Sequence, residues 1–163
     1  MCIAILSDIH DHTTHLLLAL HAAREAGCEH LLCLGDLAML STFRMLCEEW
    51  TQALDVVFGN NEYDRHAFYR VAEQYPHVCL HGDTAELRLG QRLFFMCHLP
   101  WTAQKAAQRG IYDAVFYGHT HCAAVEKIGK VPLINPGEIY GRQEKPGFAV
   151  LDAQSLRLRH ITL

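Results

Sequence analysis

The chain has 163 residues, half of them hydrophobic and a fifth charged, which is typical of one globular domain. Its net charge of −4 disfavours a nucleic-acid partner, which usually requires a basic face. No apolar run approaches the roughly 20 residues of a membrane span, and no signal peptide is expected. The seven cysteines form no Cys-x-x-Cys pair, which favours buried, reduced thiols. We therefore expect a single cytoplasmic domain over residues 1–163, without a membrane partner.

The first half of the chain alternates predicted strands with predicted helices. Strands are expected at residues 2–6, 31–34 and 53–58, and helices at 13–26, 41–50 and 65–74. Thr13 or Thr14 is the expected cap of the first helix, and Gly27 its expected stop. This alternation predicts a parallel sheet with helices on its faces.

The second half is richer in strands. Three expected strands, at residues 78–80, 85–89 and 92–97, are joined by Gly-containing turns and resemble an antiparallel meander. A helix is expected at 101–109, followed by strands at 113–117, 123–128, 131–135, 147–152 and 156–162. The pattern as a whole predicts an α/β fold, a four-layer α/β/β/α sandwich of two mixed sheets.

Polar side chains that can bind metals follow five of these strands directly. They are Asp8, His10, Asp36, Asn60, His98, His119 and His121. Taken singly, Asp8 is equally explained as a helix cap, His98 as a core histidine and Asn60 as a turn residue. Their repetition at strand ends instead favours a site for divalent transition metals, which bind carboxylate, imidazole and amide groups.

These residues, in this order, resemble the motifs of the calcineurin-like metallophosphoesterase superfamily. The motifs are Asp8-Ile9-His10, Gly35-Asp36, Gly59-Asn60-Asn61-Glu62, His98 and Gly118-His119-Thr120-His121. Asn135-Pro136-Gly137 also matches the small, lid-less YfcE-type phosphodiesterase branch. The fold that this resemblance implies agrees with the one predicted from periodicity.

The resemblance implies two divalent metal ions. One would be held by Asp8, His10, Asp36 and His121, and the second by Asp36, Asn60, His98 and His119. Asp36 would bridge them, and a hydroxide between the ions would attack phosphorus, so that Asp36, Asn60 and His119 act in catalysis through it. We predict manganese, although the ligand set also suits iron, nickel and zinc.

Two departures from the family pattern concern the chemistry. Protein-phosphatase members have a histidine general acid after the ligand asparagine, whereas this chain has Asn61, which cannot donate a proton as an acid. This favours diesters with good leaving groups. The YfcE-type branch usually has Ser/Thr-His-Gly, whereas this chain has Cys97-His98-Leu99, so the backbone contacts beside the ligand are expected to differ.

Further residues have weaker signals. Asn61 and His12 are candidates for substrate contact, although a loop histidine bonded to its neighbours explains His12 better. Arg142 could steady a phosphate oxygen, and a solvated turn arginine explains it equally well. Glu62 is expected to orient the site from behind the ligands.

We therefore predict a metal-dependent phosphodiesterase that hydrolyses small phosphodiesters. The alternatives are a phosphomonoesterase or dinucleoside polyphosphatase, and a non-catalytic scaffold related to the retromer subunit. That relative has lost part of the ligand set, whereas all seven positions are present here, which favours an enzyme. The predicted sheet edges permit a homodimer without requiring one.

Overall fold

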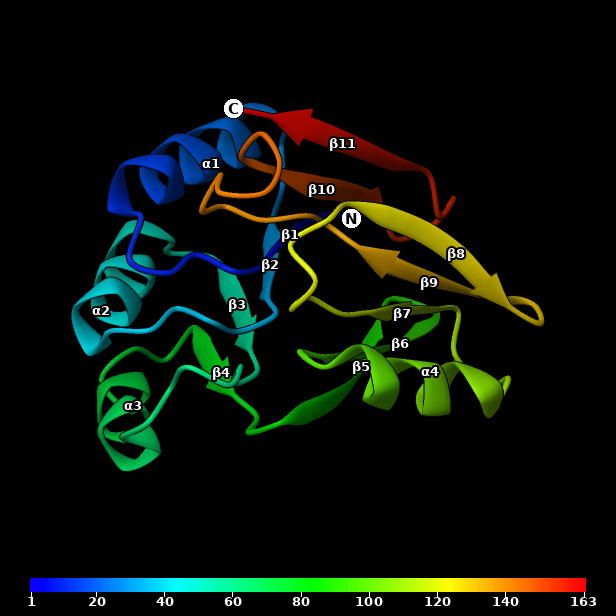
Figure 1. Ribbon diagram of the computed structural model, residues 1–163, viewed down its shortest axis with the longest axis horizontal. Coiled ribbons are helices and arrows are strands. Elements are labelled where there is room, and N and C mark those ends of the chain that lie inside the picture. Colours follow the sequence, from blue (N-terminus) through cyan, green and yellow to red (C-terminus); the bar gives the residue numbers. More distant parts are fainter.

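The computed structural model describes residues 1–163, which form eleven strands and four helices (Figure 1). The helices are α1 (Thr13–Glu25), α2 (Leu40–Glu49), α3 (Arg65–Ala72) and α4 (Pro100–Gln108). The strands are β1 (Cys2–Leu6), β2 (His30–Cys33), β3 (Ala53–Val56), β4 (Val78–Leu80), β5 (Thr84–Leu89), β6 (Arg92–Cys97), β7 (Ala114–Phe116), β8 (Ala124–Ile128), β9 (Val131–Asn135), β10 (Gly147–Asp152) and β11 (Leu158–Thr162).

The strands form two mixed sheets. The six-stranded sheet has the order β11-β10-β1-β2-β3-β4, in which β1 to β4 are parallel. The five-stranded sheet has the order β5-β6-β7-β9-β8, in which β6, β7 and β9 are parallel. Helices α1, α2 and α3 lie on the outer side of the first sheet, and α4 lies on the far side of the second (Figure 1).

Three apolar layers hold this arrangement together. Alternation along β1 sends Ala4 and Leu6 outward to the helices and Ile3 and Ile5 inward to the other sheet. The inner layer is completed by residues such as Phe94 from β6. On the other side, the alanines of α4 pack against the outer face of the second sheet. The predicted four-layer sandwich is confirmed.

Some local predictions are wrong. Val78–Leu80 is not part of a meander: it pairs parallel with β3, because α3 makes the crossover that returns the chain in the same direction. Gly82, with a φ of +94°, then leads the chain to the other sheet. The cap of α1 is His12, whose Nδ1 accepts from the His15 N–H, so Thr13, Thr14 and Asp8 do not cap that helix.

Other boundaries move by one or two residues, as at β2 and α3. The seven cysteines form no disulfide, as expected, but Cys79 is exposed and only four of the seven are buried. No helix is long and apolar enough to cross a membrane.

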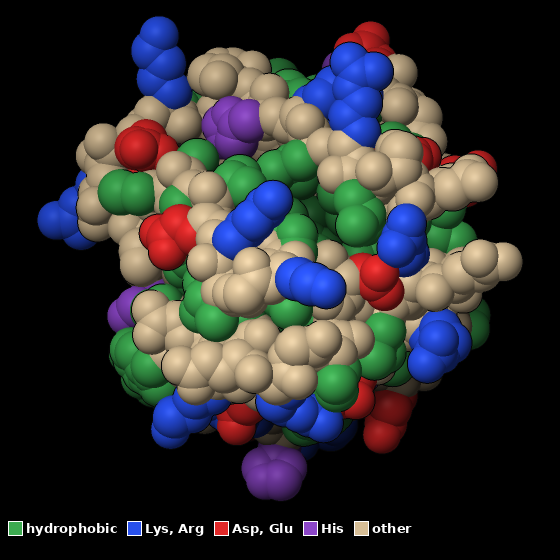
Figure 2. Space-filling view, turned by 90° about the vertical axis from the view of Figure 1, so that its right-hand side faces the viewer, with side chains coloured by type: hydrophobic (Ala, Val, Ile, Leu, Met, Phe, Trp, Pro, Cys, Tyr) green, Lys and Arg blue, Asp and Glu red, His purple; other side chains and the backbone are tan.

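One face of the sandwich carries a hollow that is separate from the predicted site. Figure 2 shows hydrophobic side chains at the centre of this face, with Lys and Arg side chains around them. A groove of about 550 Å³ lies between the two sheets and is lined by Lys127, Lys130, Leu156 and Leu158 among others. None of its lining residues belongs to the predicted metal ligands.

Candidate metal centre

The seven predicted ligands follow the carboxyl ends of β1, β2, β3, β6 and β7, and the structure brings these ends together. Asp8 and His10 come from the loop after β1, and Asp36 from the loop after β2. Backbone bonds join these two loops: Ile9 N and His10 N both donate to Asp36 O, at 3.0 and 2.9 Å. The parallel strands therefore place the side chains at one edge of the sandwich, as they do in α/β folds generally.

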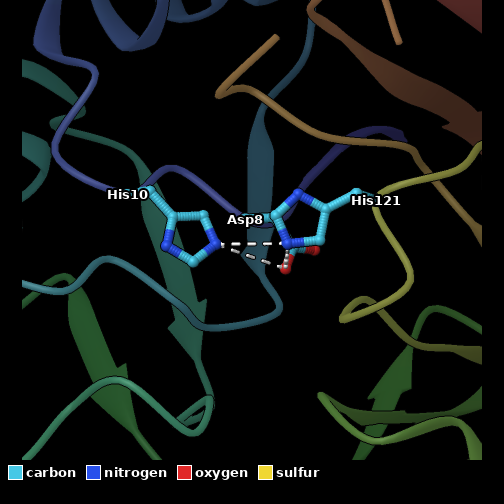
Figure 3. A group of neighbouring side chains, drawn as sticks. All are labelled: Asp8, His10 and His121. Atoms are coloured by element: carbon cyan, nitrogen blue, oxygen red, sulfur yellow. Dashed lines mark hydrogen bonds and ion pairs between the residues drawn. The ribbon is translucent and has the colours of Figure 1, made fainter. Parts of the chain in front are cut away.

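Asp8, His10 and His121 form one half of the site (Figure 3). The Nε2 atoms of His10 and His121 face each other at 3.3 Å, and His121 Nε2 lies 3.3 Å from Asp8 Oδ1. The two rings are stacked, with centroids 5.0 Å apart. Donor atoms from the two sheets thus converge on one point.

Asp36, Asn60, His98 and His119 form the other half. His98 Nε2 lies 3.1 Å from Asn60 Oδ1, 3.2 Å from His119 Nδ1 and 3.5 Å from Asp36 Oδ2. Asp36 Oδ2 also lies 3.4 Å from His10 Nε2, so this carboxylate reaches both halves. The position is the one that a bridging ligand needs.

Hydrogen bonds on the outer side of two histidine rings determine which ring nitrogen carries the proton. His98 Nδ1 faces the Leu34 carbonyl at 2.8 Å and must donate to it, so in the neutral ring Nε2 presents a lone pair. His121 Nδ1 lies 2.6 Å from the Glu138 carboxylate, which leaves its Nε2 a lone pair as well. Asp8 Oδ1 is buried without a hydrogen-bond partner. Converging lone pairs and an unpartnered buried carboxylate oxygen fit a cation.

The backbone at the site is held in an uncommon conformation. Eight non-glycine residues have a positive φ, and five of them are predicted ligands. These five are Asp8, His10, Asp36, His119 and His121. Such residues persist only where the surrounding structure fixes them, and they concentrate at functional sites.

Buried acids support the ligands from behind. Glu62 is buried and accepts from the N–H groups of Leu37, Ala38 and Gly59, which ties the loops after β2 and β3 together. Glu138 holds His121 and also accepts from Gln143 N and Glu144 N. Sequence analysis missed Glu138, although its place directly after Asn135-Pro136-Gly137 could have indicated it.

Opposing effects set the charge of the central groups. Burial alone would raise the pKa of Asp36, but the nearby His98 ring and the hydrogen bonds from Asn61 hold it well below its usual range. The pKa of His10 is raised, chiefly by the Asp8 carboxylate, whose Oδ1 lies 3.9 Å from His10 Nε2.

Burial would lower the pKa of His98, but the carboxylates of Asp36 and Asp8 outweigh it and raise that pKa. The pKa of His119 is lowered by burial and by the neighbouring His98 ring, which favours the neutral imidazole that a metal ligand requires. A cation bound here would therefore displace protons from His10 and His98.

The candidate substrate residues lie differently from one another. Asn61 donates Nδ2 to Asp36 Oδ2 at 2.7 Å, so its side chain is already engaged. His12 caps α1 and stacks on His15, with ring centroids 3.5 Å apart. Arg142 is exposed in the loop between β9 and β10. Roles in substrate binding stay predictions for all three.

Comparisons with known proteins agree with this geometry. The calcineurin-like phosphoesterase superfamily domain matches residues 1–156 of the chain. A phosphodiesterase from Methanocaldococcus jannaschii is 28% identical over 166 residues, which cover 100% of this chain and 99% of that protein. The solved structure of an archaeal phosphodiesterase matches with a TM-score of 0.92 and 28% identity, covering 100% of both chains. The YfcE phosphoesterase from E. coli, at 16% identity, 99% coverage of both chains and a TM-score of 0.65, shares the fold.

The chain belongs to the calcineurin-like phosphoesterase superfamily. This membership confirms the family resemblance drawn from the motifs, the two-sheet fold and the predicted class, a hydrolase of phosphoesters that uses divalent metal ions.

Proposed function

We propose that the chain is a phosphodiesterase that hydrolyses small phosphodiesters with two divalent metal ions. One observation carries this proposal: Asp36 Oδ2 lies 3.4 Å from His10 Nε2 in one half of the site and 3.5 Å from His98 Nε2 in the other. A single carboxylate oxygen between two sets of lone pairs is what a pair of ions requires. The similarity to the phosphodiesterase from Methanocaldococcus jannaschii and to the solved structure of an archaeal phosphodiesterase supports the diester specificity.

The proposed ligand sets are those implied by the motifs. One ion would be held by Asp8, His10, Asp36 and His121, and the other by Asp36, Asn60, His98 and His119. Ions held by these residues would neutralise charge on the phosphoryl oxygens and would acidify water for in-line attack. The neutral imidazoles and the ionised Asp36 are the protonation states that such binding needs. Manganese is the proposed metal.

The residues around the ligands account for the preference for diesters. Asn61 occupies the position next to the ligand Asn60, and its amide donates to Asp36 without a titratable proton. Asn61 therefore cannot protonate a poor leaving group as it departs. Esters with good leaving groups are the proposed substrates. Glu62 and Glu138 hold the loops that carry the ligands.

Three further proposals concern the location of the protein, its assembly and its range of substrates. A cytoplasmic location follows from the cysteine usage alone. A homodimer is compatible with the free sheet edges, which are β4 and β11 in one sheet and β5 and β8 in the other. Loose discrimination among phosphoesters is proposed because no lid element accompanies the ligand-bearing loops, so few side chains surround the leaving group.

Hydrolysis of matched aryl substrates tests the proposed function. Metal-stripped protein is assayed with an aryl phosphodiester and the corresponding monoester, with and without manganese. We expect manganese-dependent diester cleavage that is lost in Asp36→Asn and kept in Glu73→Gln, which removes an exposed carboxylate at the C-terminal end of α3. Metal binding without turnover on any phosphoester would favour the scaffold, and the absence of metal binding would exclude both.

A further inference from the structure

A large aromatic side chain borders the metal centre without being part of it. Trp101, in the first turn of α4, is 52% exposed, whereas the other tryptophan, Trp50, is 1% exposed. Its ring lies beside that of His119, with centroids 5.8 Å apart and planes at 81°. An indole left half in water next to a predicted ligand offers a surface for binding.

The position of Trp101 is fixed by the helix on which it stands. Pro100 occupies the first turn of α4, and the N–H groups of Thr102 and Ala103 bond to the Leu99 carbonyl, both at 3.1 Å. Ala103, two residues on, is fully buried against the second sheet. The indole is therefore presented by a rigid element, so stacking on it requires little ordering of the protein.

A small cavity lies between the metal centre and the first turn of α4, the turn that carries Trp101. It has a volume of about 150 Å³ and is lined by Asn60 and His98, from the site, and by Leu99 and Thr102, from the start of α4. At the opposite flank, the Tyr140 ring lies 5.3 Å from that of His10. The donor atoms thus lie between two aromatic side chains, of which Trp101 is the more exposed.

We propose that Trp101 forms a subsite for a planar aromatic substituent of the substrate, such as a nucleobase. The subsite rests on the proposed function, because it requires that the phosphate of the substrate be held at the metal centre. It narrows the substrate class to phosphodiesters that carry an aromatic group. Stacking tolerates any base, because every base has a π face.

Hydrolysis of a matched pair tests the specificity. The pair is adenosine 2′,3′-cyclic monophosphate and ribose 2,3-cyclic phosphate, which have the same reacting group with and without the base. The strain of the small diester ring eases departure of the leaving oxygen, so no general acid is needed. We expect Trp101→Ala to lower kcat/KM for the adenosine ester by about tenfold or more, within the range measured for base stacking, and to leave the ribose ester almost unchanged. Trp101→Phe should retain most of the preference. Equal losses on both esters would overturn the proposal and assign Trp101 to the positioning of His119.

Fluorescence tests the same subsite without turnover. Since Trp50 is buried, quenching by adenosine monophosphate reports on Trp101, and ribose phosphate is the matched ligand without a base. We expect quenching and tighter binding for adenosine monophosphate only. Because Trp101→Ala removes the fluorescent reporter, its binding is measured by calorimetry, and the advantage of adenosine monophosphate over ribose phosphate should be lost. Ile111→Ala is the control, because Ile111 is 50% exposed just beyond the other end of α4.

The two readouts separate the proposals. Loss of diester hydrolysis in every assay, with base-dependent quenching kept, would contradict the proposed function and leave the subsite standing. Diester hydrolysis with no difference between the two phosphates, in binding or in turnover, would overturn the subsite and leave the phosphodiesterase standing.

Discussion

Asn61 donates its side-chain amide to Asp36 Oδ2 at 2.7 Å, and this is the carboxylate oxygen that lies between His10 and His98. The backbone N–H groups of Asn60 and Asn61 also donate to the other oxygen, Asp36 Oδ1, at 2.8 and 3.0 Å. The residue that stands where related phosphatases have a general acid therefore orients the central carboxylate. The first role of the Asn61 side chain is therefore to orient Asp36, the predicted bridging ligand, and contact with substrate is secondary.

Removing this amide should weaken metal binding. We expect Asn61→Ala to lower manganese affinity by about 10- to 100-fold, the usual effect of losing a group that orients a ligand. The measurement is a manganese titration of metal-stripped protein by calorimetry. Gln74→Ala, which removes an exposed amide from the end of α3, should bind manganese like the wild type. Unchanged affinity in Asn61→Ala would show that the backbone N–H groups suffice to orient Asp36.

Placing an acid at this position should change the substrate preference. We expect Asn61→His to raise the ratio of monoester to diester turnover by at least about tenfold, because an imidazole can protonate a poor leaving group and an amide cannot. Rates for aryl and alkyl monoesters are compared at saturating manganese. The increase should be larger for the alkyl ester, whose leaving group needs the proton. An equal change for both leaving groups would contradict proton donation.

Much of this arrangement could be predicted from the sequence, because the signals are local. Apolar runs of strand length, each followed directly by Asp, Asn or His, indicate both the strands and the edge at which their side chains meet. The helices follow from 3.6-residue periodicity and stop signals such as Gly27. The features that could not be predicted depend on pairing between segments that are distant in the sequence. Val78–Leu80 has the composition of any short strand, and only the crossover through α3 assigns it to the first sheet.

The supporting residues were concealed for the same reason. Glu138 touches His121 across 17 positions of sequence, and Trp101 lies beside His119 because β6 and β7 are neighbours. The place of Glu138 directly after Asn135-Pro136-Gly137 marks it as a residue of the site, but its contact with His121, like that of Trp101 with His119, follows only from the fold. Likewise His30 shows no ligand spacing, yet it lies in β2 and faces Asp55 in the next strand.

Asp55 should make the stability of the metal-free protein depend on acid pH. His30 Nε2 and His81 Nε2 each lie 2.5 Å from one of its oxygens. Burial by itself would raise the pKa of Asp55, but these two hydrogen bonds outweigh it and lower the pKa from 3.8 to about 2. The ionised carboxylate therefore stabilises the fold above about pH 4, by roughly 2 kcal/mol, and this is lost as the pH falls to about 2.

Urea unfolding of metal-free protein between pH 2 and pH 5 measures this effect. The free energy of unfolding should fall more steeply with acid in the wild type than in Asp55→Asn, whose side chain does not titrate. Asp83→Asn, at an exposed carboxylate, should follow the wild-type curve. Parallel curves for wild type and Asp55→Asn would contradict the role of the two histidines.

Gly118 should tolerate no side chain, because it lies against the ligand loop of β1. A Cβ atom on Gly118 would overlap Ser7 Oγ and lie 2.8 Å from Asp8 Oδ2, the oxygen that accepts from His119 N at 3.0 Å. We expect Gly118→Ala to separate the loops after β1 and β7 and thus to abolish manganese-dependent diester hydrolysis. Its melting temperature should fall as well, since both loops are buried at this contact.

A second substitution shows whether overlap is the cause. Ser7 Oγ is buried and makes no hydrogen bond, so Ser7→Ala alone should be tolerated and should keep diester hydrolysis. In the double variant the atom closest to the new Cβ is gone, and part of the lost activity and melting temperature should return. Such recovery is a non-additive coupling between two residues in contact, which a double-mutant cycle measures directly. Strictly additive losses would instead mean that contact with Asp8 Oδ2, and not with Ser7 Oγ, excludes a side chain at Gly118.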